Sequence, residues 1–154
     1  MILKNGKVFC VIGDGELQEG QIWEALMTAS FRKLDNLVIL FDRNKYQLDS
    51  SVESEKGEIN LKIFAEYGFN VYEVLGHDIY DIVKAYEVVV ENRIIKDDNS
   101  KILEYIKNKK DMPTIIAFNT VKGKGVSFME NTNKWHGKVP NLEEYELAKK
   151  ELGE

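Results

Sequence analysis

The chain has 154 residues, of which 44% are hydrophobic and 31% charged, and its formal net charge is −5. This length and composition are typical of one globular domain, so we interpret residues 1–154 as a single domain. The negative charge argues against a nucleic-acid-binding surface, which needs clustered Lys and Arg side chains. We find no apolar run long enough to span a bilayer and no signal-peptide pattern after Met1, which indicates a cytoplasmic location.

Two apolar runs, separated by a helical pattern, predict a strand–helix–strand unit in the first part of the chain. Residues 7–12 (KVFCVI) and 37–42 (LVILFD) are continuous apolar runs, typical of strands covered on both faces in a parallel sheet. Between them, residues 19–33 have apolar side chains at helical spacing. The single cysteine, Cys10, lies in the first run and is expected to be a small buried residue in a reducing compartment.

The alternation of strands and helices continues towards the C-terminus. Gly68 is expected to end a short helix, and Asp78 and Asn141 to cap the starts of two longer ones. Further strands are predicted over 69–74 and 113–120, and a further helix over 101–109. The helix after Asp78 has apolar residues on one predicted face: Ile79, Ile82, Val83, Tyr86 and Val90. Together these elements predict an α/β fold with a mainly parallel sheet flanked by helices.

Two loops at the carboxyl ends of predicted strands carry the candidate site, because open parallel sheets bind ligands there. Gly13-Asp14-Gly15 follows the first strand and residues 42–49 (DRNKYQLD) follow the second, so Asp14 and Asn44 should face one crevice. Carboxylate, amide and main-chain carbonyl oxygens suit Mg²⁺ or Ca²⁺ and are poor ligands for zinc. Gly15 would let the backbone approach a phosphate.

Four separated motifs resemble one protein family. GDGELQEGQIWEA, LDNLVILFDRNKYQLD, TVKGKGVSFMEN and KWHGKVPN occur in the order found in the thiamine-diphosphate-binding domain of the transketolase family. The similarity extends over nearly the whole chain and is greatest to the split form, in which this domain is a separate N-terminal subunit. The resemblance implies the thiamine-diphosphate-binding fold of the PP type.

The resemblance implies a set of cofactor-binding residues. Asp14, the Asn44 side chain and the main-chain carbonyl of Tyr46 would hold Mg²⁺, which bridges the diphosphate of thiamine diphosphate. Leu48 would place an aliphatic side chain against the thiazolium ring. The remaining residues expected beside the cofactor are Gly13, Gly15, Glu16 and His136.

The resemblance also implies two catalytic residues. His136 matches the family histidine that reaches the diphosphate end and the reacting centre, although it could instead be an ordinary loop histidine. Glu19 and Glu24 match glutamates of an acidic network at the subunit interface, while Glu19 could also simply stabilise a helix dipole. Trp23 is expected to pack in the core or the interface, and His77 to form part of a turn.

Several features depart from the family pattern. Met1 lies a few residues before the first strand, where the family has a substantial segment that supplies a strand, covering helices and substrate-contacting histidines. The chain would therefore be the C-terminal two-thirds of the family domain, with an uncovered sheet edge or face. Arg43 stands where the family often has Asp or Asn, and Asn119 where Lys is common. Residues 92–112 form a longer segment than usual, to which we assign no role.

We therefore expect a transketolase-like subunit that binds thiamine diphosphate and Mg²⁺ and transfers a two-carbon ketol unit from a ketose to an aldose. Its expected partners are a companion pyrimidine-binding subunit, a chain that supplies the upstream segment, and sugar or sugar-phosphate substrates. Without partner chains we expect no turnover. The alternatives are another thiamine-diphosphate enzyme, of the 2-oxoacid dehydrogenase or deoxyxylulose-phosphate synthase type, or a truncated non-catalytic remnant or interaction module.

Overall fold

The central feature of the fold is a five-stranded sheet with the strand order β1-β2-β7-β5-β6. The computed structural model describes residues 6–48, 50–91, 103–104 and 111–153. Four strands run parallel to their neighbours: β1 (Val8–Gly13), β2 (Leu37–Arg43), β7 (Thr114–Asn119) and β5 (Asn70–Leu75). The two-residue strand β6 (Leu103–Glu104) pairs antiparallel with β5. The predicted mainly parallel α/β sheet is therefore confirmed.

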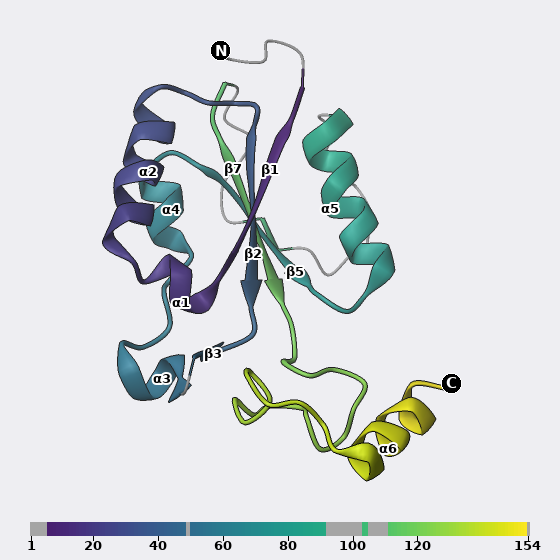
Figure 1. The fold of residues 1–154 in the computed structure, drawn as a ribbon. Helices are drawn as coiled ribbons and strands as arrows, with labels where there is room; N and C mark the ends of the chain where they lie inside the picture. Colours follow the sequence, from purple (N-terminus) through teal and green to yellow (C-terminus); the bar gives the residue numbers. More distant parts are fainter. Residues whose placement is uncertain (1–5, 49, 92–102, 105–110, 154) are drawn as a thin grey trace.

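Helices cover the two faces of the sheet (Figure 1). On one side lie α2 (Gly20–Phe31) and α4 (Lys62–Glu66), and on the other lies α5 (Ile79–Glu91). Residues alternate between the faces of each strand, so along β2 the side chain of Phe41 packs into the α2 side of the core and that of Val38 into the α5 side. Trp23 packs against the α2-side core, with its ring stacked 5.7 Å from that of Phe64.

Three of the predicted helix ends are confirmed by their capping contacts. The Asp78 carboxylate accepts hydrogen bonds from the backbone N–H groups of the first turn of α5. Asn141 and Glu144 bond reciprocally at the start of α6 (Leu142–Leu152), with N···O distances of 2.8 and 2.9 Å. Gly68 follows α4 with a φ of +93°, in the left-handed region that favours glycine.

The predicted apolar face of α5 is confirmed for Ile82, which packs against the core, but is wrong for three of its other residues. The side chains of Ile79, Val83 and Val90 are exposed, by 72%, 48% and 55%. The helix instead turns its small residue Ala85 and the neighbouring Val88 towards the sheet. A small side chain allows the helix to lie close to the strands, and sequence periodicity alone cannot distinguish that face from a larger apolar one beside it.

Strand β1 is far less covered than its apolar sequence predicts. It lies at the edge of the sheet, with Phe9 42% and Val11 68% exposed, and Cys10 is exposed, contrary to prediction. Phe9 touches Tyr86 of α5, at 5.5 Å between ring centroids, but α5 packs mainly against β5 and the central strands. The expected uncovered edge of the sheet is thus found at β1.

Four short elements escaped sequence prediction. These are α1 (Asp14–Leu17), β3 (Tyr46–Gln47), β4 (Ser50–Ser51) and α3 (Val52–Glu55). The predicted helix over 101–109 is wrong at Leu103–Glu104, which form β6, and the rest of that segment lies outside the described residues. Within the described part of the chain, no helix is both long and apolar enough to cross a membrane.

Candidate functional site

The loops that follow β2 and β7 leave the sheet at the same end (Figure 1). The end of β1 reaches this region too, because β1 and β2 pair in register up to Gly13 and Asp42. The carboxyl ends of three neighbouring parallel strands therefore meet here, which is where open parallel sheets bind ligands. The structure therefore brings the predicted loops after β1 and β2 together at this end of the sheet.

Asp14 joins the end of β1 to the loop after β2. It is the first residue of α1 rather than part of an open loop, and it is only 7% exposed. Its Oδ2 accepts a hydrogen bond of 2.7 Å from the backbone N–H of Lys45. Burial raises the pKa of this carboxyl from 3.8 to about 6, against the opposing effect of backbone hydrogen bonds from Lys45 and Asn44. A buried carboxylate with a raised pKa favours a cation beside it.

Asn44 is held in a defined orientation. Its Oδ1 accepts a hydrogen bond of 2.9 Å from the backbone N–H of Tyr46, and its Nδ2 donates one of 2.9 Å to Asp42. The other carboxylate oxygen of Asp42 accepts a hydrogen bond from the hydroxyl of Thr120. The amide of Asn44 is therefore tied to the ends of both β2 and β7.

The donor set at this position suits a hard divalent cation. Among the described residues, no group of three or more His, Cys, Asp or Glu side chains could hold a metal ion. A metal here would depend on mixed oxygen donors, namely the Asp14 carboxylate, the Asn44 amide and the Tyr46 carbonyl. Such a set suits Mg²⁺, which keeps several positions for water and substrate phosphate.

The residues around Asp14 make close local contacts. The backbone N–H of Gly13 donates to Glu16 Oε2 at 2.9 Å, so the Glu16 carboxylate folds back onto the end of β1. A Cβ atom at Gly15 would lie 3.1 Å from Cβ of Gln47. The glycine at position 15 thus allows α1 to pack closely against β3, in addition to any approach by a phosphate.

A cavity of about 460 Å³ opens beside the two loops. Its lining includes Asn44 and Tyr46 from the loop after β2, and Thr120, Val121 and Asn131 from the segment after β7. It therefore lies between the loop after β2 and the segment after β7, where an elongated ligand could contact both.

The segment after β7 forms a compact loop, residues 121–131. Its two ends are joined by a hydrogen bond of 3.0 Å from Asn131 N–H to the Lys122 carbonyl. A Cβ atom at Gly123, whose φ is +75°, would meet the Met129 carbonyl oxygen at 2.2 Å, so only glycine fits. The Tyr46 hydroxyl donates to the Asn131 carbonyl and thereby connects this loop to the proposed metal ligands.

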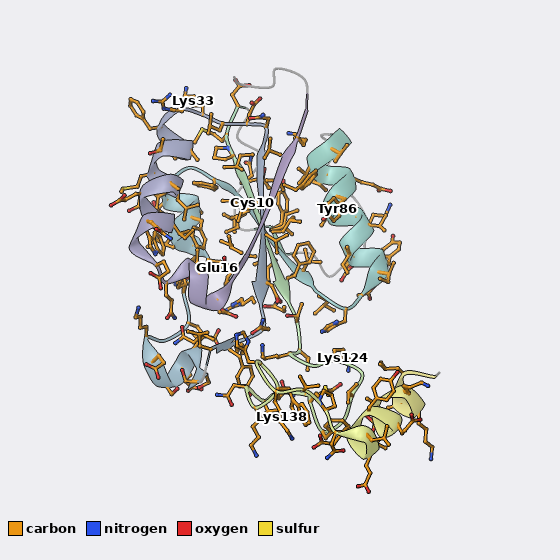
Figure 2. The ribbon with its side chains drawn as sticks, in the orientation of Figure 1. Cys10, Glu16, Lys33, Tyr86, Lys124 and Lys138 are labelled. Carbon is orange, nitrogen blue, oxygen red and sulfur yellow. The ribbon has the colours of Figure 1, made fainter. Side chains whose placement is uncertain are left out.

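His136 lies just beyond this loop, in the C-terminal segment that also carries Lys124 and Lys138 (Figure 2). It is exposed, and its Nδ1 lies 3.4 Å from Nζ of Lys122. Sequence reasoning did not select Lys122, although its place in the KGKG motif, ahead of WHGK, could have indicated it. The neighbouring Trp135 packs against Phe128, with 5.1 Å between ring centroids.

The structure does not bring all the predicted site residues together. Asp14 meets the loop that carries Asn44 and Tyr46, as expected. Leu48, Glu19, Glu24 and His136 are all exposed. Among the described residues, no hydrogen bond links any of these four to Asp14 or Asn44.

A charged cluster of Arg43, Lys45, Glu58 and Glu73, together with Asn119, also escaped sequence prediction. Arg43 and Asn119, which appeared as two separate departures from the family pattern, are paired in register on β2 and β7. Arg43 binds Glu73 at 2.9 Å and Glu58 at 2.7 Å. A hydrogen bond from Lys45 and the charge of Arg43 hold the pKa of Glu58 below its usual value.

Comparison with known proteins identifies the family of this domain. The family model described as the transketolase thiamine diphosphate binding domain matches residues 2–154. A subunit of the apulose-4-phosphate transketolase of Actinobacillus succinogenes is 37% identical over 147 residues, which make up 95% of this chain and 47% of the relative. The corresponding protein of Phocaeicola vulgatus is 36% identical over 149 residues, or 96% of this chain and 47% of the relative. The chain thus spans about half the length of these relatives.

A solved structure and a further sequence relative show the same similarity. A transketolase from Campylobacter jejuni matches with a TM-score of 0.78 and 31% identity, over 97% of this chain and 21% of the other. Human transketolase is 34% identical in sequence over 133 residues, which cover 86% of this chain and 18% of that protein. The match therefore concerns one part of much longer chains.

Proposed function

The chain belongs to the transketolase family through its thiamine-diphosphate-binding domain, and from this we propose that it forms the diphosphate- and metal-binding part of a transketolase-type active site. The proposed reaction transfers a two-carbon ketol unit from a ketose to an aldose, in the cytoplasm. One observation carries the proposal: the buried carboxylate of Asp14 is bonded to the loop that presents Asn44 and Tyr46.

In this proposal the oxygen donors at the strand ends hold Mg²⁺. The Asp14 carboxylate, the Asn44 amide oxygen and the Tyr46 carbonyl would bind the ion, leaving positions for phosphate oxygens and water. Gly13, Gly15 and Glu16 would lie beside the diphosphate. The negative charge of the diphosphate requires a cation here, because two anionic groups close together in a partly buried site repel each other.

When bound, thiamine diphosphate supplies the nucleophilic carbon of its thiazolium ring, and the protein supplies binding and orientation. Leu48 would offer an apolar surface to that ring. His136 has two ring nitrogens that can donate a hydrogen bond or carry a proton at the reacting end. The neighbouring Lys122 adds a positive charge beside it, which suits a phosphate-bearing substrate or the diphosphate itself.

The proposed site needs a second subunit. Glu19 and Glu24 are exposed at and after the start of α2, and we propose that this helix faces a companion pyrimidine-binding subunit. Two of the relatives are named as single subunits of a transketolase, which is consistent with a companion chain. We therefore expect no catalytic turnover by the isolated chain.

Calorimetric titration of thiamine diphosphate in the presence of Mg²⁺ tests the proposal. The titration should be carried out with and without a companion subunit, on the wild type, on Asp14→Ala and on the control Asp35→Ala, which changes an exposed residue at the opposite end of β2. We expect saturable, Mg²⁺-dependent binding that Asp14→Ala abolishes and Asp35→Ala preserves. Equal binding by all three proteins would remove Asp14 from the site, and ketol transfer by the isolated chain would contradict the need for a partner.

A further inference from the structure

Arg43 ends β2 immediately before the proposed metal ligands. Successive side chains of a strand point to opposite faces of the sheet. Asp42 therefore lies on the same face as Leu40, towards α5, and Arg43 lies on the same face as Phe41, towards α2. The two residues before Asn44 can thus anchor its loop from both sides of the sheet.

On the α5 side the anchor is Asp42. One carboxylate oxygen accepts from the Thr120 hydroxyl, and the other accepts from Asn44 Nδ2 at 2.9 Å. This contact orients the Asn44 amide, but it involves no residue of β5. Arg43 lies between Asp42 and Asn44 in the chain. The geometry of the hydrogen bond between these two side chains therefore depends on where the backbone of Arg43 is held.

On the α2 side the anchor is the Arg43 guanidinium. Nη1 lies 2.9 Å from Glu73 Oε1 of β5 and 3.3 Å from Asn119 Oδ1 of β7, and Nη2 lies 2.7 Å from Glu58. Asn119 completes the cluster by donating to Glu73 at 2.8 Å. One side chain thus connects the ends of three strands, through charge-assisted hydrogen bonds that are stronger than neutral ones.

The partly buried position of the cluster protects these bonds from solvent. The side chains of Arg43 and Glu73 are only 18% and 12% exposed, so salt screens their attraction less than that of a surface pair. The planar fork of an arginine can reach several acceptors at once, whereas the single ammonium group of a lysine cannot do so with the same geometry.

We propose that Arg43 is a positioning residue that holds the loop of residues 44–46 against Asp14 and thereby sets the affinity of the site for a divalent cation with diphosphate. The loop contacts begin two residues beyond it, with Lys45 N–H bonded to Asp14 and Tyr46 N–H bonded to Asn44. The identity of the ligand in this inference rests on the proposed function, whereas the role of Arg43 in the geometry of the loop does not.

Amide hydrogen exchange of the metal-free chain tests the geometric part. The variant is Arg43→Gln, and the matched control is Arg32→Gln, which alters an exposed arginine at the end of α2. We expect exchange at the Lys45 and Tyr46 amides to become about tenfold faster in Arg43→Gln, because a charge-assisted hydrogen-bond network is lost. The amide of Leu40, within the sheet, should exchange at its wild-type rate, as should all three amides in the control.

Two results would overturn the inference. Unchanged exchange at Lys45 and Tyr46 would show that the loop does not depend on Arg43. An equal acceleration at Leu40 would show that the side chain only stabilises the sheet. If Arg43→Gln does not fold, the milder Glu73→Gln removes the charge that Arg43 binds and should give the same selective pattern, and its failure to do so would equally refute the proposal.

Titration with thiamine diphosphate and Mg²⁺ then tests the consequence for binding. Residues that orient metal ligands typically change metal affinity by about 10- to 100-fold, and we expect a loss in this range for Arg43→Gln. If Arg43→Gln accelerates exchange only at Lys45 and Tyr46 but none of the proteins binds cofactor, the proposed function is refuted. The role of Arg43 in positioning the loop would then remain. Normal cofactor affinity in Arg43→Gln would refute the positioning role alone.

Discussion

Replacing Asp14 by asparagine should stabilise the metal-free chain at neutral pH. Burial raises the pKa of Asp14 from 3.8 to about 6, so the folded state binds its proton more tightly than the unfolded state does. The contribution of this carboxyl to the free energy of unfolding is therefore at its full value below about pH 4. It falls as the pH rises from about 4 to 6 and stays low above that range. The shift of about two pKa units corresponds to about 3 kcal/mol at pH 7.5.

The asparagine side chain in Asp14→Asn would retain an acceptor oxygen for the Lys45 N–H while removing the buried charge. Urea unfolding of wild type and Asp14→Asn at pH 7.5 and pH 3.5, without metal, measures the difference directly. We expect the variant to be more stable at pH 7.5 by up to about 3 kcal/mol and to lose this advantage at pH 3.5. The exposed control Asp35→Asn should show no such pH-dependent difference.

The reasoning would be refuted if Asp14→Asn were no more stable than wild type at pH 7.5, or if the two proteins differed equally at both pH values. Adding Mg²⁺ with thiamine diphosphate should reverse the order at pH 7.5, because ligand binding stabilises only the protein that retains the carboxylate. A binding residue that destabilises the empty protein is a common feature of functional sites.

Two further predictions concern the compact loop after β7. Tyr46→Phe removes the hydroxyl that donates to the Asn131 carbonyl, and we expect the Asn131 amide to exchange about fivefold faster with little change in thermal unfolding; an unchanged rate would mean that the loop holds itself in place. Val121 N–H donates to His77 Nε2 at 2.8 Å, so His77→Leu should accelerate exchange of the Val121 amide by a similar factor. His77→Gln, whose side-chain oxygen can accept the same bond, should restore the wild-type rate, and equal rates in the two variants would exclude this hydrogen bond as the anchor.

The strand–helix alternation was predictable because it depends on local patterns. Continuous apolar runs indicated β1 and β2, and the capping residues Asp78 and Asn141 marked the starts of α5 and α6. The exposure of β1 was not predictable in the same way, because the sequence of an edge strand such as VFCVI can be as apolar as that of a central strand. Coverage depends on where the neighbouring helices lie, which is a tertiary property.

One part of the candidate site was likewise predictable from the sequence, and another part was not. Asp14 and Asn44 could be placed together from the sequence, because parallel neighbouring strands bring their carboxyl ends to one edge. The Arg43–Asn119 pairing could not, since it depends on the register between β2 and β7, two strands far apart in the sequence. A sequence does not show which polar residues are partners, whereas the fold shows which of them form hydrogen bonds and ion pairs with one another.

The exposed edge strand β1 has a practical consequence for measurement. Its outer side presents a row of backbone donors and acceptors flanked by the exposed side chains of Phe9 and Val11, a combination that templates pairing with another polypeptide. At the high protein concentrations that calorimetry requires, self-association through this strand would compete with ligand binding and distort apparent stoichiometry. Sedimentation velocity over a dilution series, in the presence of a thiol reductant to protect Cys10, would establish the concentration window in which titrations report on single molecules.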